Sequence, residues 1–339
     1  MSLLSSASLR FMQLNAENLF VFMDRYKGQN LEGMTEEEWQ KCSTAPTANK
    51  SLRKIWSLVE TIKEVSPDIV MLNEVGGEES LKNFNHHFLG GQFRPMIIEG
   101  NSDRGIDLAY LVKEDPEVQY LLISHKNRPI DFLYEHEREH SSRTSHYFSR
   151  DVLELRIFKK GEGSPRLICL LVHLKSKLDP DGWDPQGRGR REAELKTLVK
   201  IYSEIQREMD GKVPIIIGGD FNGIAHKQAC ETEFASIYAD SDLQELFDVS
   251  AKEVTEEDRT TQLQFFRDGS VRLLQLDYFF LSPQLHSAIQ PEESLVYRYK
   301  GDMGMTLPLP TNLEQRGGLP SDHYPIVATL ANPLNRQWK

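Results

Sequence analysis

The stretch VPIIIGGDFN, residues 213–222, constrains the fold more than any other part of the chain. Its three consecutive isoleucines favour a short strand buried on both faces, and the two glycines that follow allow a tight exit from that strand. Asp220 and Asn222 come next, and both side chains leave the same face if the chain is still extended there. The stretch therefore predicts two oxygen-bearing groups at the rim of a sheet, which suits a hard cation or an attacking water. An Asx-type turn after a strand is the competing interpretation.

Two other expected strands end in the same kind of side chain. Residues 9–14 (LRFMQL) read as a strand that runs into Asn15 and Glu17, and residues 68–72 (DIVML) read as a second strand that delivers Glu74. Between them, apolar residues at helical spacing from Leu52 to Val65 predict a helix docked by one face. Three strands are thus expected to finish in carboxylate or amide groups.

The remaining segments predict a large mixed fold. We expect strands at residues 93–99, 106–112, 118–124, 152–158, 167–172, 273–281 and 324–330, and a second docking helix at 195–209. The weak apolar periodicity between residues 125 and 149 predicts a long surface loop, and such loops are often functional. Because no internal repeat or linker is evident, one domain of two sheets flanked by helices is the simplest architecture.

Composition narrows the function and the compartment. The 339 residues carry a formal net charge of −11, so any polyanion must be held by a local basic patch with metal ions rather than by an overall basic field. The three cysteines lack the spacing of a zinc site or a disulfide framework, which favours a reducing, cytoplasmic compartment. No signal peptide or membrane-spanning run is visible, although a secreted protein without its leader would look the same. We expect a monomer.

Oxygen-bearing and imidazole groups at or beside the expected strand ends suggest chemistry. They are Asn15, Glu17, Glu74, Asp220, Asn222, Asp277, Asp322 and His323. Oxygen ligands without cysteine favour Mg²⁺ or Mn²⁺ over zinc. His173 and His323 can exchange a proton near neutral pH or hold positive charge against a phosphate. A single Asp at a strand end is usually a cap, but eight such groups after separate strands are harder to explain in that way.

The order of these motifs resembles that of the endonuclease/exonuclease/phosphatase superfamily, which includes pancreatic deoxyribonuclease, exonuclease III and inositol polyphosphate 5-phosphatases. The motifs are Asn15-Ala16-Glu17-Asn18-Leu19-Phe20, the strand end at Glu74, Arg104-Gly105-Ile106-Asp107, Ser149-Arg150-Asp151, His173, Gly219-Asp220-Phe221-Asn222, Leu276-Asp277-Tyr278 and Ser321-Asp322-His323. The resemblance implies one domain, residues 9–332, of the α+β class. That domain is a four-layer αββα sandwich in which two mainly antiparallel sheets pack face to face, with helices outside.

The resemblance also implies a Mg²⁺-dependent phosphoric ester hydrolase in which Mn²⁺ can substitute. It implies a metal shell of Asn15, Glu17, Glu74 and Asp322. Asp220 and Asn222 resemble the pair that orients or deprotonates the attacking water and contacts the phosphate. His323, supported by Asp277, resembles the histidine that binds the scissile phosphate and assists proton transfer. His173 with Asp107 resembles a second histidine–carboxylate pair, and Arg150 resembles a phosphate-contacting arginine.

The substrate is less constrained by the sequence. Residues 126–146, the arginines at 188, 190 and 191, and residues 297–319 are expected to wall the cleft. Basic residues there can hold a DNA or RNA backbone, so we favour a nuclease acting on a phosphodiester. A phosphatase or phosphodiesterase acting on a small phosphorylated lipid or inositol head group is the competing enzyme. A catalytically inactive interaction module with the same sandwich is a third interpretation.

Overall fold

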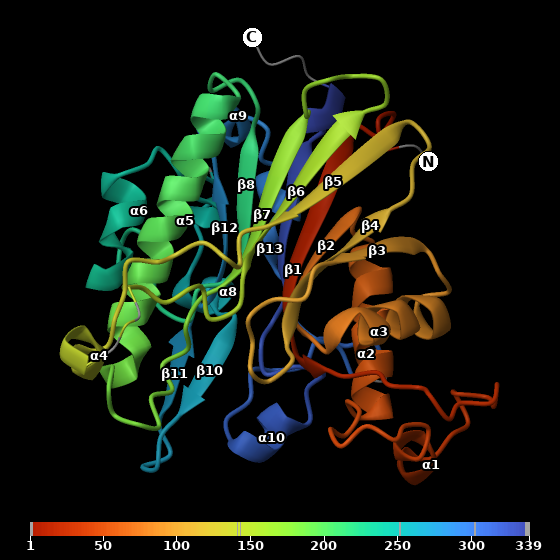
Figure 1. Ribbon diagram of the computed structural model, residues 1–339. Helices are drawn as coiled ribbons and strands as arrows, with labels where there is room; N and C mark the ends of the chain where they lie inside the picture. The colour runs from red at the N-terminus through yellow and green to blue at the C-terminus, as the bar shows by residue number, and fades with distance from the viewer. Residues whose placement is uncertain (1–2, 141, 143, 251, 302, 336–339) are drawn as a thin grey trace.

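The centre of the computed structural model, which describes residues 3–140, 142, 144–250, 252–301 and 303–335, is a pair of six-stranded sheets (Figure 1). The first sheet has the order β13 (Leu295–Val296), β14 (Ile326–Ala331), β1 (Ser8–Leu19), β2 (Ile69–Val75), β4 (Asp107–Lys113) and β3 (Phe93–Ile97). The second has the order β5 (Val118–Ser124), β6 (Val152–Lys159), β7 (Leu167–His173), β8 (Ile215–Asp220), β12 (Asp277–Leu281) and β9 (Gln244–Glu245).

Each sheet has a parallel pair at its centre. β1 runs parallel to β2 and β7 runs parallel to β8, whereas the other neighbouring strands are antiparallel. A parallel pair requires a crossover, which is supplied by α2 (Leu52–Val65) in the first sheet and by α5 (Arg188–Glu208) in the second. The parallel pairs bring the carboxyl ends of β1, β2, β7 and β8 to one end of the molecule.

Helices cover the outer face of each sheet, which completes a four-layer αββα sandwich (Figure 1). Apolar residues of α2 pack on β1 and β2, and those of α5 pack on β7 and β8. The shorter helices are α1 (Glu36–Gln40), α3 (Gly77–Asn83), α4 (Glu135–His140), α6 (Ala235–Ala239), α7 (Leu246–Val249), α8 (Glu256–Arg259), α9 (Pro283–His286) and α10 (Leu313–Gly317). The α+β sandwich expected from the sequence is therefore confirmed.

The core consists of three apolar layers that follow from strand alternation. In β1, Leu9 and Phe11 face the second sheet, while Met12 and Leu14 face α2. Because both faces of this strand are covered, its sequence is apolar at successive positions. Gln13 breaks the run, and its fully buried side chain lies between the sheets, where it donates hydrogen bonds to Asn73 and Asp277.

The strand expected at residues 273–281 is wrong in its extent. β11 (Val271–Leu274) pairs with β10 (Gln262–Phe265) in a separate two-stranded ribbon, and β12 begins only at Asp277. At the break, the Thr261 hydroxyl accepts hydrogen bonds from the N–H groups of Leu276 (2.9 Å) and Asp277 (3.1 Å). An apolar run in the sequence does not indicate where one strand ends and the next strand begins to pair with another partner. The sequence therefore predicted one strand where the structure has two.

The segment at residues 125–149 is not entirely a loop, because it contains the short helix α4. Its two arms are joined by a bridge between Pro129 and Tyr147. In the described part of the chain, no helix has both the length and the apolar character needed to cross a membrane.

Candidate active site

The expected site residues meet where the central strands of both sheets end. In the second sheet, Asp220 at the end of β8 is the register partner of His173 on β7 and of Asp277 on β12. From the facing sheet, the Asn15 Nδ2 group on β1 donates to the Asp220 Oδ2 atom (3.1 Å). Residues far apart in the sequence are thus brought to one edge, as the sequence predicted.

The backbone turns sharply at this edge. Glu17, Asn18, Glu74 and Asn222 all have a left-handed backbone, with φ between 49° and 63°. The pairing of β2 with both of its neighbours is interrupted before Leu19 and before Val75. Non-glycine residues seldom adopt this conformation, and such strain tends to cluster at functional sites. The turns end the ladder and aim polar side chains toward the gap between the sheets.

Asn222 does not extend the strand as the sequence suggested. Its left-handed backbone carries it out of the strand direction, and its N–H group donates to the Asp220 Oδ1 atom (2.8 Å). This is the local bond of an Asx-type turn. The Asn222 side chain donates to the carbonyl of Leu174 (3.0 Å), so the two side chains do not leave one face together. Asp220 and Asn222 therefore form an Asx-type turn and also belong to the site, because the turn holds the Asp220 carboxylate in place.

Glu74 and Asp220 form a pair of carboxylates bridged by an amide. The Asn15 Nδ2 group lies 3.5 Å from the Glu74 Oε1 atom and 3.1 Å from the Asp220 Oδ2 atom. The backbone N–H of Asn18 donates to the other Glu74 oxygen (3.0 Å). Burial raises the pKa of Asp220 to about 7, although the neighbouring His323 charge opposes this. A buried carboxyl of this kind can exchange a proton near neutral pH.

His323 and Asp277 form a buried ion pair. The His323 Nδ1 atom lies 2.7 Å from the Asp277 Oδ2 atom, and its Nε2 atom lies 4.0 Å from the Asp220 Oδ2 atom. Burial alone would lower the pKa of His323, but the charges of Asp277, Asp220 and Asp322 raise it well above its ordinary value. Asp277 is in turn fixed by the Gln13 Nε2 group (3.0 Å). The arrangement favours an imidazolium with its Nε2 side toward the site.

The site also has the donor set for a hard cation. Ligand atoms of Asp220, Asp277 and His323 lie within 4.8 Å of one another. Since Asp277 and His323 form an ion pair with each other, we regard Glu74 and Asn15, with Asp220 beside them, as the better candidates for holding a cation. The Asn15 Nδ2 group donates toward both carboxylates, and its Oδ1 atom accepts the N–H of Glu17 (3.0 Å), so binding a cation through Oδ1 would require the Asn15 amide to turn over. Carboxylate and carbonyl oxygens fit Mg²⁺ or Mn²⁺.

Two of the residues expected in a metal shell lie among lysines instead. The Glu17 carboxylate is 2.9 Å from the Lys54 Nζ atom and 3.5 Å from the Lys50 Nζ atom. Lys50 is buried, which lowers its pKa to about 8, while the charges of Glu17 and Asp322 oppose that shift. In this conformation Glu17 is a partner of lysines rather than of a cation, and Asp322 lies near the same lysine.

His173, Asp107 and Arg150 lie at the same edge, but not in the expected pairing. The His173 Nε2 atom is 3.6 Å from the Asp220 Oδ2 atom, and burial followed by the charge of Arg150 lowers the pKa of His173 well below its ordinary value. Asp107 accepts the N–H of Gly100 (2.6 Å), and within the described residues no hydrogen bond joins Asp107 to His173. Arg150 is buried, and its charge interacts with the carboxylates of Glu74 and Asp220.

The sequence analysis missed several residues that hold the site together. They are Gln13, Lys50, Asn73, Glu194, Thr261 and Gln262. Gln13 was visible as a polar residue in an apolar strand, and it could have been identified on that ground. Gln262 gave no signal, yet its amide lies 3.3 Å from the His323 Nε2 atom and its backbone bridges to His323.

Glu194 anchors two loops of the site to α5. Its fully buried carboxylate accepts the N–H of Ser149 (2.7 Å), next to Arg150, and the N–H of Lys175 (2.7 Å), two residues beyond His173. Glu194→Gln places an amide N–H₂ against one of these donors and leaves a buried N–H unpaired. We expect a loss of about 1–3 kcal/mol in the free energy of unfolding, measured by urea denaturation.

A matched control lies on the same helix. Glu208 forms a partly exposed ion pair with Arg156 (2.6 Å), so Glu208→Gln is expected to cost less than about 1 kcal/mol. Equal effects of the two substitutions would mean that Glu194 does not anchor the loops.

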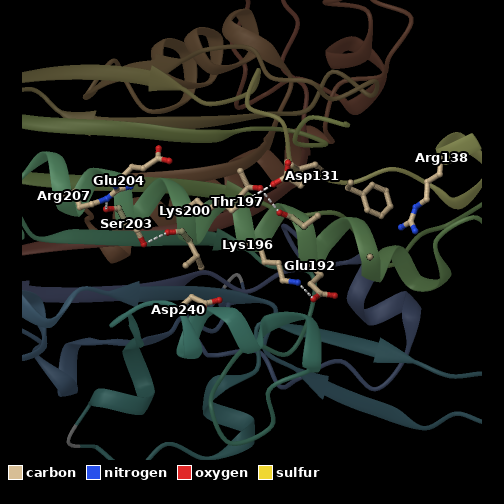
Figure 2. Close-up of a pocket in the computed structure, with 15 residues that line it drawn as sticks. Asp131, Arg138, Glu192, Lys196, Thr197, Lys200, Ser203, Glu204, Arg207 and Asp240 are labelled. Carbon is tan, nitrogen blue, oxygen red and sulfur yellow. Dashed lines mark hydrogen bonds and ion pairs between the residues drawn. The ribbon is translucent and has the colours of Figure 1, made fainter. Parts of the chain in front are cut away.

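A large hollow lies elsewhere on the surface. Figure 2 shows this hollow, of about 670 Å³, along the outer face of α5. Its lining includes residues 130–132 and Arg138 of the loop expected to wall the cleft, but none of the expected catalytic or metal-binding residues. Charged groups in it form pairs such as Lys196 with Glu192 (2.6 Å) and Lys200 with Asp131 (2.8 Å). The residues expected to carry the chemistry lie at the strand ends and not in this hollow.

Comparison with known proteins adds evidence on the fold. The sequence matches no protein-family model and no curated protein. Among solved structures, the human Nocturnin catalytic domain with bound sulfate is 18% identical, with a TM-score of 0.56 over 95% of this chain and 94% of that one. D. rerio TDP2 complexed with a single-strand DNA product is 14% identical, with a TM-score of 0.55 over 96% and 99% of the two chains.

A third similar structure is the endonuclease/exonuclease/phosphatase family protein from Bacteroides thetaiotaomicron. It is 16% identical, with a TM-score of 0.55 over 95% of this chain and 94% of that one. These structures span nearly the whole chain. The chain therefore has the fold of the endonuclease/exonuclease/phosphatase superfamily.

Proposed function

We propose that this protein is a Mg²⁺-dependent phosphodiester hydrolase that cleaves nucleic acid. The observation that carries the proposal is the convergence of Glu74, Asp220 and the His323–Asp277 pair at one edge of two sheets. Hydrolysis of a phosphodiester needs an in-line water, neutralisation of the phosphate oxygens and support for the departing oxygen. Each need can be met by a group at this edge.

Asp220 is the group that accepts the proton of the attacking water. Its carboxylate is fixed by the N–H of Asn222 and by the Asn15 amide, so it has little freedom to turn away. A pKa of about 7, raised by burial, suits a general base at neutral pH.

His323 and Arg150 neutralise the phosphate. Asp277 holds the Nδ1 side of the His323 ring. The Nε2 atom lies 3.3 Å from the Gln262 amide nitrogen and 4.0 Å from the Asp220 Oδ2 atom, and it is the atom that would donate to a phosphate oxygen or to the departing oxygen. Burial lowers the pKa of Arg150, and the charges of Glu194, Glu74 and Asp220 oppose this, so the guanidinium lies close to these carboxylates. A cation held by Glu74 and Asn15 would add charge stabilisation to the phosphate oxygens.

Nucleic acid is favoured over a small head group by the basic residues beside the site and by one neighbour. Arg104 and Lys175 lie near Arg150, since the charge of Arg104 acts on Arg150 and the charge of Arg150 acts on Lys175. The similar D. rerio TDP2 was solved with a single-strand DNA product. Both observations support a polynucleotide substrate.

Metal dependence is the direct test of this proposal. Protein stripped of metal with EDTA is expected to hydrolyse bis-p-nitrophenyl phosphate roughly 10²-fold or more slowly, and Mg²⁺ or Mn²⁺ is expected to restore the rate. The measurement is release of p-nitrophenolate in metal-free buffer with each ion added back. Full activity in EDTA would contradict the proposal.

A substrate panel then tests the choice of nucleic acid. Single-stranded DNA, duplex DNA, RNA, inositol phosphates and sphingomyelin are each incubated with the Mg²⁺-loaded protein. We expect cleavage of a polynucleotide that weakens steeply with added salt, because several phosphates are contacted. Cleavage confined to the inositol phosphates or to sphingomyelin would replace the nuclease by the head-group hydrolase.

A further inference from the structure

Aromatic rings from two separate loops of the second sheet pack against one another. Tyr134, His136 and His146 come from the loop between β5 and β6, and Trp183 comes from the loop between β7 and α5. The His136 and Trp183 ring centroids are 4.3 Å apart, those of Tyr134 and Trp183 are 5.9 Å apart, and those of Tyr134 and His146 are 5.1 Å apart. We call these four residues the rim cluster.

Two members of the rim cluster, His136 and Trp183, are exposed, while Tyr134 is half-buried and His146 is buried. Trp183 is 55% exposed, whereas the edge-to-face pair of Trp39 and Phe88 is buried under α2. Tyr147, in the same loop as Tyr134, is 52% exposed. Rings that only stabilised the two loops would be better buried, since apolar area left in water contributes nothing to folding. The open face of Trp183 is available to another flat ring.

Both loops leave the catalytic edge of the second sheet. β5 ends and β6 begins beside Asp151, β7 ends at His173, and Glu194 ties both loops to α5. In Figure 1 α4, which lies within the first loop, lies beside the lower half of α5. Both loops of the cluster therefore begin at the edge of the sheet that carries the active site.

A groove lies between the rim cluster and the backbone of Arg150. Its volume is about 670 Å³, and its lining includes His146, Tyr147, Asn101 and Arg190. The Asn101 N–H donates to the carbonyl oxygen of Arg150 (3.0 Å), so one wall of the groove is adjacent to the backbone of this arginine. The groove thus has His146 of the cluster in its lining and the backbone of Arg150 beside it.

Basic residues border this path in a molecule that is acidic as a whole. Burial lowers the pKa of Lys175, and the nearby charges of Arg150 and Arg190 lower it further. Asp103 in the groove wall and the exposed Glu135 and Glu139 on α4 interrupt the basic character. Charge alone is therefore a weak source of affinity here, and contacts with flat rings would have to supply much of it.

We infer that the rim cluster is a stacking site for the unpaired bases of a nucleic-acid strand whose scissile phosphate lies at Asp220 and His323. This inference rests on the function proposed above. Every base has a flat face that can stack on an aromatic ring, so such a site is tolerant of sequence. A duplex hides these faces between its base pairs, and the cluster should therefore prefer a single strand over a duplex.

Binding without cleavage tests the inference. Fluorescein-labelled dT12, rU12 and a 12-base-pair DNA duplex are titrated with the protein in EDTA, and the dissociation constant is read from anisotropy. We expect Trp183→Leu to weaken binding of a single strand roughly 5- to 100-fold, as expected for the loss of one stacking contact, and Trp183→Phe to keep most of the affinity. The dT12 and rU12 arms identify the kind of strand that is bound.

Two further variants distinguish stacking from electrostatic attraction and from non-specific apolar binding. Leu178→Ala changes a 73% exposed apolar residue of the same loop and is expected to leave binding unchanged. Arg190→Gln is expected to reduce the slope of log affinity against log salt by about one unit or less, whereas Trp183→Leu should lower affinity at every salt concentration with the slope preserved. Because Trp183 and Leu178 are exposed, neither substitution threatens the fold, and thermal unfolding confirms this for each variant.

The outcomes distinguish this inference from the proposed function. If Trp183→Leu binds dT12 and rU12 as tightly as the unmodified protein, or if the duplex binds as tightly as the single strands, the stacking site is wrong. That result leaves the hydrolysis of bis-p-nitrophenyl phosphate, and with it the proposed function, untouched. If the substitution abolishes binding while the unmodified protein hydrolyses no phosphodiester, the stacking site is supported and the proposed function fails.

Discussion

His323→Ala and Asp220→Ala are each expected to lower the hydrolysis of bis-p-nitrophenyl phosphate by about 10²–10⁴-fold. This is the usual contribution of a positioned group that transfers a proton. The first substitution removes the imidazolium that is bonded to Asp277 (2.7 Å), and the second removes the carboxylate that Asn15 and Asn222 hold in place. The measurement is the initial rate of p-nitrophenolate release at saturating Mg²⁺.

The same two substitutions should have opposite effects on stability. His323→Ala leaves the buried Asp277 without its charge partner, which typically costs about 3–5 kcal/mol. Asp220→Ala removes a carboxyl whose pKa is raised in the fold to about 7. A raised carboxyl pKa means that ionisation opposes folding above the unfolded pKa, so at neutral pH this substitution should be neutral or stabilising.

Stability is measured by urea denaturation followed by circular dichroism, separately from the rate of hydrolysis. His86→Ala, which changes an exposed histidine on the first sheet's helical side, is the control and should alter neither rate nor stability. Near-normal turnover in both site variants would refute the assignment of these residues. If the alanine variants lost turnover because they were completely unfolded, His323→Gln and Asp220→Asn would decide between a catalytic and a folding role. These two substitutions keep the side-chain volume.

Gly219→Ala is expected to be among the most destabilising single substitutions in the chain. Gly219 has φ of +150°, and a Cβ atom added there would lie 2.0 Å from the carbonyl oxygen of Val172 on the neighbouring strand. That contact involves backbone, so relief requires β7 and β8 to separate where His173 and Asp220 are register partners. We expect a loss of more than about 3 kcal/mol in the free energy of unfolding, together with a large loss of activity.

Gly163→Ala is the matched control for this prediction. Gly163 lies in the turn between β6 and β7, and a Cβ atom there would meet nothing within 4 Å. Its substitution should change the free energy of unfolding by no more than about 0.5 kcal/mol. If urea denaturation gave similar values for the two alanine variants, the close approach of β7 and β8 at Gly219 would be wrong.

The sequence predicted the strand ends well because they carry two signals at once. At Asp220, an apolar run long enough for a buried strand is followed directly by a polar group that would be costly inside it. The same combination predicted Glu74 at this edge, whereas Asp277 was read as a carboxylate within an apolar run and lies at the start of β12. Local pattern was therefore sufficient to predict the layers of the fold and most of the residues that meet there.

Partners across the fold could not be predicted, because they depend on contacts between distant segments. Glu17 was expected beside a metal ion, yet its carboxylate lies between Lys50 and Lys54, which sit at the start of α2. Asp107 was paired with His173 by analogy, but Asp220 is the carboxylate within reach of that ring. The burial of a lysine, and which of two nearby carboxylates contacts a histidine, produce no periodic pattern in the sequence.

The pairing of β1 with β14 joins segments about three hundred residues apart, with Ser8 opposite Ala331. During synthesis on the ribosome, β1 must wait for about three hundred further residues before this neighbour emerges, and His323 arrives only just ahead of it. A chain truncated before His323 would lack the imidazole of the proposed site, and β1 would have no partner on that side. We expect such a chain to aggregate through the open edge of its first sheet.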